Sequence, residues 1–489
     1  MPEEELTAAE AAGKRAVGNT LLRASGDIAG KLASLVLFAA MARELSASEL
    51  GVFVFGLAFM QIAMLPVEFG YDPYLLRRVA KERASIHELF FDVIGLKLAL
   101  MVPIFAVSAA VLAIADYDAT TRITVAVLAF GFALDAIANT IYSVFLAHER
   151  NGLIAVSVVI QRLAAAAAGL VALFLGYGVI AVAITYSAAS VLGLLVAGVM
   201  LARRIGLPRR AVSARGWLRL TAVSLPFGLQ DVFSVMLFRL DAVILSLLAT
   251  EAAVGRYGGA YRLLEASMFI VYALMGAFTP MYTYLGRDTE PTVGAVLARS
   301  VKLALVPLVP IAAVLGVLAE PVCRLLFGAG LAGAADPLRV LAPVIILIGV
   351  VTLASALLVS RRNPMAIVWS TAVTVVVNVV LNLALIPMWD ETGAAVAMLG
   401  SEIVLLAIVG PLAARAVGGL RWLPTITGPA VAGASMVAIL FALAAVPLVA
   451  VIVGSVAYAL ILIAVERIIA PRDVELATRI ARHWLVARA

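Results

Sequence analysis

The chain has 489 residues, of which 64% are hydrophobic and only 13% are charged, and its mean hydropathy is +1.09. Soluble domains are about 45–50% apolar and about 25% charged, so the composition excludes a soluble globular protein and predicts a chain that crosses the membrane many times. The formal net charge of +6 does not indicate nucleic-acid binding, because positive residues in a membrane protein reflect its topology. The single cysteine, Cys323, excludes an internal disulfide.

The N-terminal segment is acidic and then basic, without the apolar run and small-residue cleavage site of a signal peptide. We therefore expect residues 1–19 to be a cytoplasmic segment and the first span to be retained. A spanning helix needs about 20 mostly apolar residues, and about fourteen segments meet this requirement. In chain order they are 20–42, 50–75, 89–115, 122–147, 153–175, 179–202, 217–249, 256–284, 294–319, 336–360, 364–387, 393–414, 424–446 and 448–468.

Positive charges are concentrated in every second loop, among them 75–83, 203–219 and 360–363. About two dozen Lys and Arg fall on this side and about five on the other, an asymmetry that predicts cytoplasmic N- and C-termini. The tail over 471–489 alternates Arg with apolar residues at helical spacing, which predicts a basic amphipathic helix at the membrane surface.

Three pairs of similar stretches indicate an internal repeat with offsets of about 204 to 215 residues. They are RNGLIAVSV (150–158) with RNPMAIVWS (362–370), GVIAVAITYSAASVLGLLV (178–196) with GAAVAMLGSEIVLLAIV (393–409), and LSASELGVF (45–53) with LATEAAVGRY (248–257). An even number of spans separates the copies, so both have one orientation and are related by an axis along the membrane normal.

The predicted fold is therefore an all-α polytopic membrane protein with two six-helix lobes, related by a pseudo-two-fold axis, and two further C-terminal helices. Its parts are the N-terminal lobe 20–203, a basic cytoplasmic linker 204–216, the C-terminal lobe 217–414, helices 13 and 14 over 424–468, and the tail.

Charged residues inside the apolar spans are the candidate functional residues, because each is costly in a bilayer. In the first span, Arg23, Asp27 and Lys31 recur every four residues and so share one helical face. They form either a ladder of salt bridges that neutralises itself or a polar stripe facing a water-filled cavity.

The seventh span carries Arg239 and Asp241, which lie roughly 160° apart around a helix with about 100° per residue. We therefore expect each to find water or a partner on another helix rather than each other. In the eighth span, Arg262 and Glu265 have i,i+3 spacing, and a Gly258-Gly259 pair permits close helix approach. Asp241 and Arg262 either line the transport pathway or make structural bonds between helices.

Other polar residues within spans have simpler interpretations. In the second span, Glu68 and Asp72 are four residues apart and are followed by basic residues at the cytoplasmic mouth, and Lys97 in the third span fits packing within a lobe. Arg162 in the fifth span is a cavity candidate. In contrast, the polar side chains of Asn378 and Asn382 most simply link neighbouring helices by hydrogen bonds. The other polar residues within spans fit packing inside a lobe or a structural pair: Asp92, Asp135, Asn139, Gln161 and Glu402.

Signatures of an enzyme are missing from the sequence, which has no HExxH, GxSxG or P-loop pattern and no large extramembrane domain. The three histidines have no metal-ligand spacing around them, so we predict neither a metal site nor a cofactor. These observations favour a transporter or a non-transporting membrane scaffold over an enzyme.

Several stretches resemble bacterial polysaccharide-lipid flippases of the Wzx type. They are ARELSASELGVFVF (42–55) with EFGYDPYLLRRVA (68–80), SLPFGLQDVFSVMLFRLDAVILSLLATEAAVGRYGGAYRLLE (224–265), FGAGLAGAADPLRVLAP (327–343) and NVVLNLALIPMWDETGAAVAMLGSEI (378–403). The resemblance runs in order from about residue 18 to 410. Its loose motifs specify the superfamily better than they specify the substrate, and that superfamily includes lipid II flippases and MATE-type drug exporters. Ser46-Ala47 stands where the family commonly has Gly-Pro, which predicts a looser turn.

The resemblance implies that two lobes enclose a cationic cavity, which takes an undecaprenyl-diphosphate-linked oligosaccharide and turns its head group across the bacterial cytoplasmic membrane by alternating access. A diphosphate is anionic, so basic side chains in the cavity wall have a partner there. The residues implied to bind substrate are Arg23, Lys31, Arg77, Arg162, Arg239 and Arg262. Those implied to balance charge or to take H⁺ or Na⁺ for coupling are Asp27, Asp72, Asp241 and Glu265.

Three functions stay open at the level of sequence. The first is the flippase, with the lipid-linked oligosaccharide and membrane lipids as partners and a polymerase or glycosyltransferases of the same pathway as further ones. The second is a lipid II flippase or a drug/cation antiporter. The third is a scaffold of a cell-envelope polymer assembly, which would tolerate Arg23→Ala, Lys31→Ala and Arg262→Ala.

Overall fold

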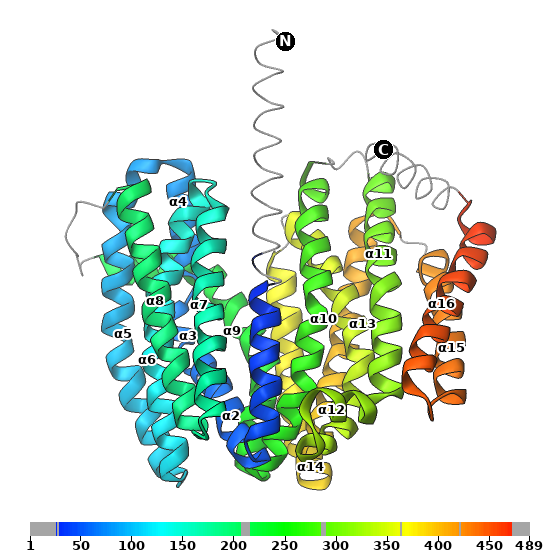
Figure 1. The fold of residues 1–489 in the computed structure, drawn as a ribbon. Coiled ribbons are helices and arrows are strands. Elements are labelled where there is room, and N and C mark those ends of the chain that lie inside the picture. Colours follow the sequence, from blue (N-terminus) through cyan, green and yellow to red (C-terminus); the bar gives the residue numbers. More distant parts are fainter. Residues whose placement is uncertain are drawn as a thin grey trace, which may run out of the picture. The chain divides into compact units, whose positions relative to one another are not determined.

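The computed structural model describes residues 26, 29–206, 216–284, 290–361, 364–419 and 422–471, and this part of the chain is helical throughout, without a strand. The chain divides into two compact units, Met1–Gly258 and Gly259–Ala489 (Figure 1). The predicted division into lobes at the linker 204–216 remains a prediction, and much of that linker, like the segment 1–19 and the tail beyond residue 471, lies outside the described residues.

The first unit begins with a helix over residues 29–44. It continues through α2 (Ala47–Ala63), α3 (Leu65–Glu68), α4 (Tyr71–Lys81), the short 3₁₀ helix η1 (Arg83–Ser85), α5 (Ile86–Ile114), α6 (Ala119–Ala147), α7 (Asn151–Phe174), α8 (Val179–Arg204), α9 (Trp217–Leu248) and the first turns of α10 (Glu251–Tyr284). One core cluster packs α4 to α8 together around Leu75, Phe90, Val144 and Phe145, all buried.

The second unit contains the rest of α10, then α11 (Glu290–Val317), α12 (Ala319–Phe327), the 3₁₀ helix η4 (Ala329–Ala334), α13 (Ala335–Ser360), α14 (Pro364–Ala416), α15 (Trp422–Ala442) and α16 (Pro447–Ile469). A second cluster, built around Met436, Leu440 and Tyr458, packs the two C-terminal helices α15 and α16 against α11.

The helix α14 reverses direction near its middle. Trp389 and Asp390 have non-helical backbone angles, with φ of +44° at Asp390. A Cβ added to Gly393 would collide with the carbonyl of Leu385, although eight residues of a straight helix span about 12 Å. The chain therefore turns back at Trp389–Asp390, between the segments predicted as spans 364–387 and 393–414.

Ten helices in the described part of the chain are long and apolar enough to cross a membrane, or eleven if the bent pair Ala47–Ala63 and Leu65–Lys81 is one span. The predicted number of fourteen is not confirmed. The helix over 29–44 is shorter than a span in its described part, α9 is not among the ten, and α14 counts once despite its reversal.

Short side chains cap the helices where the sequence places turns. Ser46 accepts a hydrogen bond from the Glu49 amide at 3.2 Å, and the Glu49 carboxylate accepts from the Ser46 amide at 3.0 Å, which is a capping box. The turn before α2, which the replacement of Gly-Pro by Ser46-Ala47 predicts to be looser, is therefore held by reciprocal hydrogen bonds. Serine thus supplies a cap at this turn, and a looser turn than that of the family stays a prediction.

The cap of α6 gives a pH-dependent prediction. Burial acts to raise the pKa of Asp118, but hydrogen bonds from Thr121 and Thr120 to its carboxylate outweigh burial, so the pKa lies below its usual value. A lowered folded-state pKa contributes stability above the unfolded-state pKa, and this stability is lost as the pH falls through the folded-state pKa. We expect Asp118→Ala to lower the thermal unfolding temperature at neutral pH, since loss of a cap costs about 0.5–2 kcal/mol, and to have little effect in strong acid. Thermal unfolding in detergent across pH, with Glu88→Ala in the exposed first turn of α5 as the control, measures this difference, and an equal effect at all pH values would contradict it.

Candidate functional site

The second span is broken where its acidic residues lie. The axis bends by 48° between the pair Ala47–Ala63 and Leu65–Lys81, and Gly70 adopts a left-handed φ of +69° between α3 and α4. A Cβ on Gly70 would collide with the backbone of Ser224 and Gly228, so only glycine allows α9 to approach here. Broken helices at membrane depth commonly mark transport sites, because they free polar groups for a ligand.

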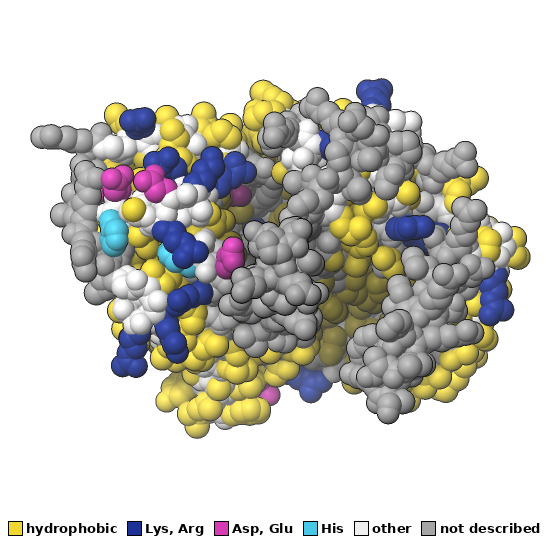
Figure 2. Space-filling model, turned by 90° about the horizontal axis from the view of Figure 1, so that it is seen from above, with side chains coloured by type: hydrophobic (Ala, Val, Ile, Leu, Met, Phe, Trp, Pro, Cys, Tyr) yellow, Lys and Arg dark blue, Asp and Glu magenta, His cyan; other side chains and the backbone are white. Residues whose placement is uncertain are grey.

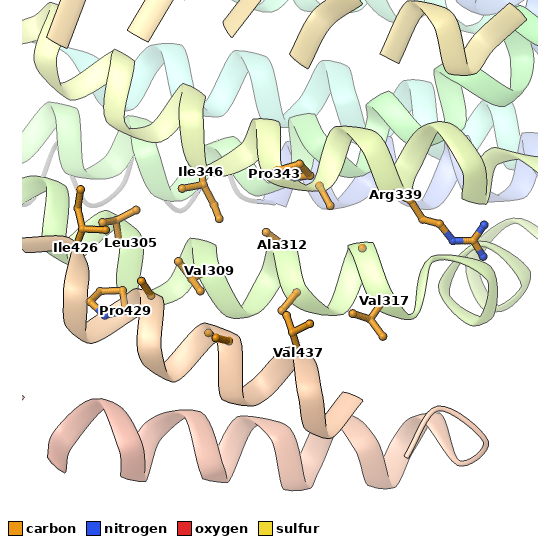
Figure 3. Close-up of a pocket in the computed structure, with 16 residues that line it drawn as sticks. Leu305, Val309, Ala312, Val317, Arg339, Pro343, Ile346, Ile426, Pro429 and Val437 are labelled. Carbon is orange, nitrogen blue, oxygen red and sulfur yellow. The ribbon is translucent and has the colours of Figure 1, made fainter. Parts of the chain in front are cut away.

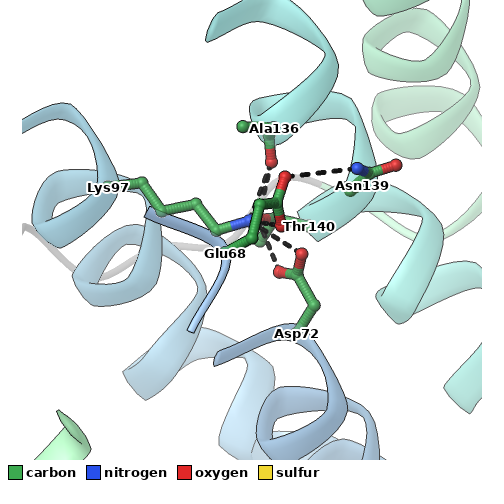
Figure 4. Close-up of polar contacts among 6 residues, drawn as sticks. All are labelled: Glu68, Asp72, Lys97, Ala136, Asn139 and Thr140. Carbon is green, nitrogen blue, oxygen red and sulfur yellow. Dashed lines mark hydrogen bonds and ion pairs between the residues drawn. The ribbon is translucent and has the colours of Figure 1, made fainter. Parts of the chain in front are cut away.

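A buried lysine bridges two carboxylates across this break (Figure 4). Lys97 of α5 donates from Nζ to Asp72 Oδ2 at 2.7 Å, to Glu68 Oε2 at 3.1 Å and to the Ala136 carbonyl at 2.9 Å. Its side chain is 0% exposed, whereas that of Asp72 is 11% exposed and that of Glu68 is 31% exposed. The ammonium is therefore sealed in protein, and Glu68 is the member of the group that solvent reaches.

The second oxygen of each carboxylate has a partner on α6. Thr140 donates to Asp72 Oδ1 at 2.8 Å, and Asn139 donates to Glu68 Oε1 at 3.3 Å. We call Glu68, Asp72, Lys97, Asn139 and Thr140 the Lys97 cluster. With both acids ionised, it carries two negative charges and one positive charge. A charge imbalance in a buried site is costly, which makes the Lys97 cluster a candidate functional site.

Sequence reasoning found these residues separately but did not bring them together. Lys97 is buried within its unit, as expected, and Asp72 was a candidate for coupling. The contact joins residues 25 and 29 positions apart on different helices, which no periodicity reveals. The sequence features that point to this cluster are a lysine within an apolar span and two acidic residues that flank a glycine.

The two charged residues at the middle of α9 have partners on different helices, as predicted. Arg239 donates from Nε to Gln61 Oε1 of α2 at 2.8 Å. Asp241 is buried and accepts a hydrogen bond from the Tyr257 hydroxyl of α10 at 2.9 Å. Asp231, further towards the N-terminus of α9, is exposed and interacts electrostatically with Asp72 of the Lys97 cluster.

The other predicted arginines occupy three different settings. Arg77 is exposed on α4, with its guanidinium carbon 4.5 Å from the centre of the Phe227 ring, a cation–π contact. Arg162 is partly buried on α7 and fills the space over Gly30 of the first helix. Arg262 pairs with Glu265 at 3.2 Å within α10, as the i,i+3 spacing predicts.

The predicted charge ladder of the first span is described only in part. Arg23 and Asp27 lie outside the described residues, and Lys31 is partly buried on the helix over 29–44. That the predicted site residues of the two units surround one cavity remains a prediction.

A further polar group lies within the first unit. The carboxylate of Asp135 accepts hydrogen bonds from Gln161 at 2.7 Å and from the Tyr186 hydroxyl at 2.9 Å, and Gln161 also donates to Ser190 at 3.2 Å. These contacts join α6, α7 and α8.

In α14, Asn382 donates to the carbonyl and to the side-chain oxygen of Asn378, both at 3.0 Å. This bond runs along one helix, so a link to a neighbouring helix stays a prediction.

The second unit contains an apolar pocket of about 380 Å³ between α11, α13 and α15 (Figure 3). Its wall includes Val309, Ala312, Ile346 and Val437, and Arg339 lies at one end. Such a wall suits a hydrocarbon chain rather than a sugar. Among the described residues, no group of three or more His, Cys, Asp or Glu side chains could hold a metal ion.

Basic side chains gather at one end of the first unit. Arg77, Arg78 and Lys81 of α4 and Arg203 and Arg204 of α8 are exposed, and Arg150 donates to the Arg204 carbonyl at 2.7 Å. Figure 2 shows Lys and Arg side chains on the face that contains these helix ends, with acidic and histidine side chains among them. This end corresponds to the side that the distribution of charge predicts to be cytoplasmic.

Comparisons with known proteins identify the family. Residues 16–285 match the family model described as polysaccharide biosynthesis protein, which is more than half of the chain. The probable low-salt glycan biosynthesis flippase Agl15 of Haloferax volcanii is 26% identical over 372 residues, which cover 73% of this chain and 74% of that protein.

Solved structures show the same fold. The lipid II flippase MurJ in an inward closed conformation matches with a TM-score of 0.74 at 12% identity, over 91% of this chain and 99% of that one. An inward-facing MATE multidrug transporter of the MOP superfamily matches with a TM-score of 0.64 at 15% identity, over 82% and 98% of the two chains. The many apolar helices and the family match establish a multi-pass membrane protein, and the chain belongs to the polysaccharide biosynthesis protein family.

Proposed function

We propose that this protein is a flippase, which moves an undecaprenyl-diphosphate-linked oligosaccharide from the inner to the outer leaflet of a bacterial cytoplasmic membrane by alternating access, with both termini in the cytoplasm. The observation that carries the proposal is the setting of Arg239. It is a guanidinium in an apolar stretch of α9 that donates from Nε to Gln61 Oε1 of α2 at 2.8 Å, so it lies where two helices of the first unit meet. A guanidinium group suits an anionic ligand, because it binds the oxygens of a phosphate in pairs.

Two further features support the same substrate class. The apolar pocket of the second unit is lined by hydrocarbon side chains and has one arginine at its end, which fits the division of a lipid-linked diphosphate into chain and head group. The basic end of the first unit attracts anionic head groups from the side on which such lipids would enter. The polymerase and glycosyltransferases of the same pathway are the partners that this substrate implies.

Transport into proteoliposomes tests the substrate and the role of Arg239 together. Purified protein is incorporated into vesicles that contain a lipid-linked oligosaccharide, and head-group access to a membrane-impermeant glycosidase is followed over time. We expect Arg239→Gln to slow translocation roughly tenfold to a hundredfold, because a hydrogen bond to a charged group contributes about 1.5–3 kcal/mol. The matched control is Arg122→Gln. Arg122 is exposed in the first turn of α6, where it pairs with Asp116 at 3.5 Å, so its replacement should leave the rate of translocation unchanged.

Three outcomes would contradict the proposal. Translocation of lipid II alone by the wild-type protein in the same assay, or of cationic drugs alone, would assign a different substrate class. A complete lack of translocation, with an intact fold, would favour the membrane scaffold.

We also propose that translocation is coupled to H⁺ or Na⁺ at Glu68. Lys97 and Asp72 form a compact pair of opposite charges, so the additional negative charge lies on Glu68, the more exposed acid. The charged groups facing it are Asp72 from α4 and Lys97 from α5, and α6 contributes the neutral Asn139. Asp231 of α9 and Thr140 of α6 interact with Asp72.

The variant Glu68→Gln tests the coupling separately from the substrate. It leaves the Lys97–Asp72 pair neutral, so we expect it to fold and to exchange lipid without a gradient. It should lose the acceleration that an imposed pH or Na⁺ gradient gives the wild type. Glu88→Gln, in the exposed first turn of α5, is the control. Full acceleration of Glu68→Gln by both gradients would exclude coupling at this residue.

A further inference from the structure

Four glutamates lie before the first predicted span. They are Glu3, Glu4, Glu5 and Glu10, and the first basic residue that follows them is Lys14. The family match begins at residue 16, so these glutamates lie outside the part of the chain that matches the family. Blocks of like charge near a chain end are often interaction tails, which bind a surface of opposite charge. We call residues 3–10 the acidic segment.

The ends of four helices meet at the basic end of the first unit. Val79 of α4, Ala147 of α6 and Leu201 of α8 are buried in one apolar cluster, close to the points where these three helices end. The helix α7 begins at the same place, because Arg150, the residue before it, donates to the Arg204 carbonyl at 2.7 Å. The basic side chains of these helix ends therefore form one surface.

The charges exposed on this surface are mostly positive. Its exposed basic side chains come from α4, η1, α8 and the residue before α7, and are Arg77, Arg78, Lys81, Arg83, Arg150, Arg203 and Arg204. Their exposed acidic neighbours are Glu82, Glu88 and Glu149. Figure 2 shows the same excess of basic over acidic side chains on this face. The described residues of the basic end thus do not balance its positive charge among themselves.

The chain enters the first unit beside this surface. A Cβ added to Gly26 would lie 3.1 Å from the Cβ of Ala155, which is in the second turn of α7 and five residues after Arg150. Glu10 lies sixteen residues before Gly26, and an extended chain of that length spans up to about 53–58 Å. The acidic segment is therefore within reach of the basic end.

We propose that the acidic segment docks on the basic end of the first unit and forms an autoinhibitory contact there. The two have opposite charge, and both are predicted to face the cytoplasm. Attachment to the same chain gives the segment an effective concentration that is in the mM range for short flexible linkers, so weak individual pairs are sufficient. Exposed ion pairs are weak and are screened by salt, with a Debye length of about 8 Å at physiological ionic strength, so the contact is reversible.

The docked segment competes with anionic head groups for the same basic side chains. While it covers the basic end, it keeps an entering anionic head group away from this surface. Anionic membrane lipids displace it, because they bind clusters of Lys and Arg at the membrane surface. Docking itself does not depend on the proposed function, whereas its effect on translocation rests on that function.

A distance between two spin labels tests the docking. Ala8→Cys in the acidic segment and Ala84→Cys in the exposed turn η1 are labelled with nitroxides in a Cys323→Ala background, which removes the natural thiol. In vesicles of phosphatidylcholine at low salt, we expect pulsed electron paramagnetic resonance to show a short and narrow distance. High salt should weaken this component, because it screens the charges.

Charge-removing variants make the test specific. Replacing all four glutamates of the acidic segment with glutamine should abolish the short distance, and so should Arg203→Gln combined with Arg204→Gln. Arg122→Gln, which removes an exposed charge at the other end of α6, is the matched control and should retain it. Absence of the short distance in the unmodified sequence, or its persistence in either charge-removing variant, would overturn the docking.

Translocation measures whether the docking inhibits. In phosphatidylcholine vesicles, the variant without the four glutamates should translocate the lipid-linked oligosaccharide several-fold faster than the wild type. The difference should disappear when the vesicles also contain phosphatidylglycerol, which displaces the segment. Equal rates in phosphatidylcholine would overturn the inhibition while leaving the flippase intact. Lack of translocation by both proteins would instead contradict the proposed function.

Discussion

Replacing Lys97 with methionine is expected to lower the free energy of unfolding by about 3–5 kcal/mol, the usual cost of leaving a buried charge without its partner. Lys97 is fully buried and donates to Asp72, to Glu68 and to a backbone carbonyl. Without it, two carboxylates face each other beside a broken helix. The measurement is thermal or denaturant unfolding of the purified protein in detergent.

Two further variants make this prediction specific. Arg122→Met removes an exposed pair, Arg122–Asp116, whose side chains are 45% and 98% exposed, and should change stability by only about 0–1 kcal/mol. Adding Glu68→Gln and Asp72→Asn to Lys97→Met removes all three charges and should restore most of the lost stability. Equal unfolding of Lys97→Met and Arg122→Met would show that the cluster has no structural role.

Replacing Lys302 with methionine is expected to be comparably destabilising, and to act on the second unit. Lys302 of α11 pairs with Glu466 of α16 at 2.8 Å, and the two side chains are only 14% and 10% exposed. A Cβ on Gly428 of α15 would collide with this glutamate, and Tyr458 donates to the Val306 carbonyl at 2.9 Å, so α16 is fixed to α11 by polar bonds. Loss of the lysine leaves the buried glutamate unpaired, at a cost of about 3–5 kcal/mol.

The control for this variant is Arg324→Met. Arg324 pairs with Glu320 at 2.8 Å, the same separation, but the two side chains are 62% and 49% exposed. It should therefore alter stability by about 0–1 kcal/mol. Limited proteolysis of the loop between α15 and α16 measures whether these helices detach. Unchanged cleavage and unfolding in Lys302→Met would mean that α16 is held by its apolar packing alone.

Local geometry explains which predictions were accurate. The spacing of Arg239 and Asp241 placed them on different sides of one helix, and the structure gives them partners on α2 and α10. Arg262 and Glu265 pair as their i,i+3 spacing requires. These results depend only on helical periodicity, which a single segment of sequence contains.

Contacts between distant segments were not accessible in this way. Gly51 and Gly255 were aligned by the repeat, yet nothing in the alignment indicated that their helices touch there, where a Cβ on either glycine would collide with the backbone of the other helix. The partners of Lys97 were equally hidden, because a lysine in an apolar span is compatible with several neighbours.

The sequence by itself determined that this protein lies in a membrane and that it resembles polysaccharide-lipid flippases, because hydropathy and similarity are properties of the linear chain. Only the tertiary structure decided that Glu68, Asp72 and Lys97 form one cluster and that two repeat-related glycines meet. The physical reason is that both arrangements depend on how helices pack. A bend of 48° and the absence of two Cβ atoms set that packing, and neither quantity is encoded in the periodicity of any one segment.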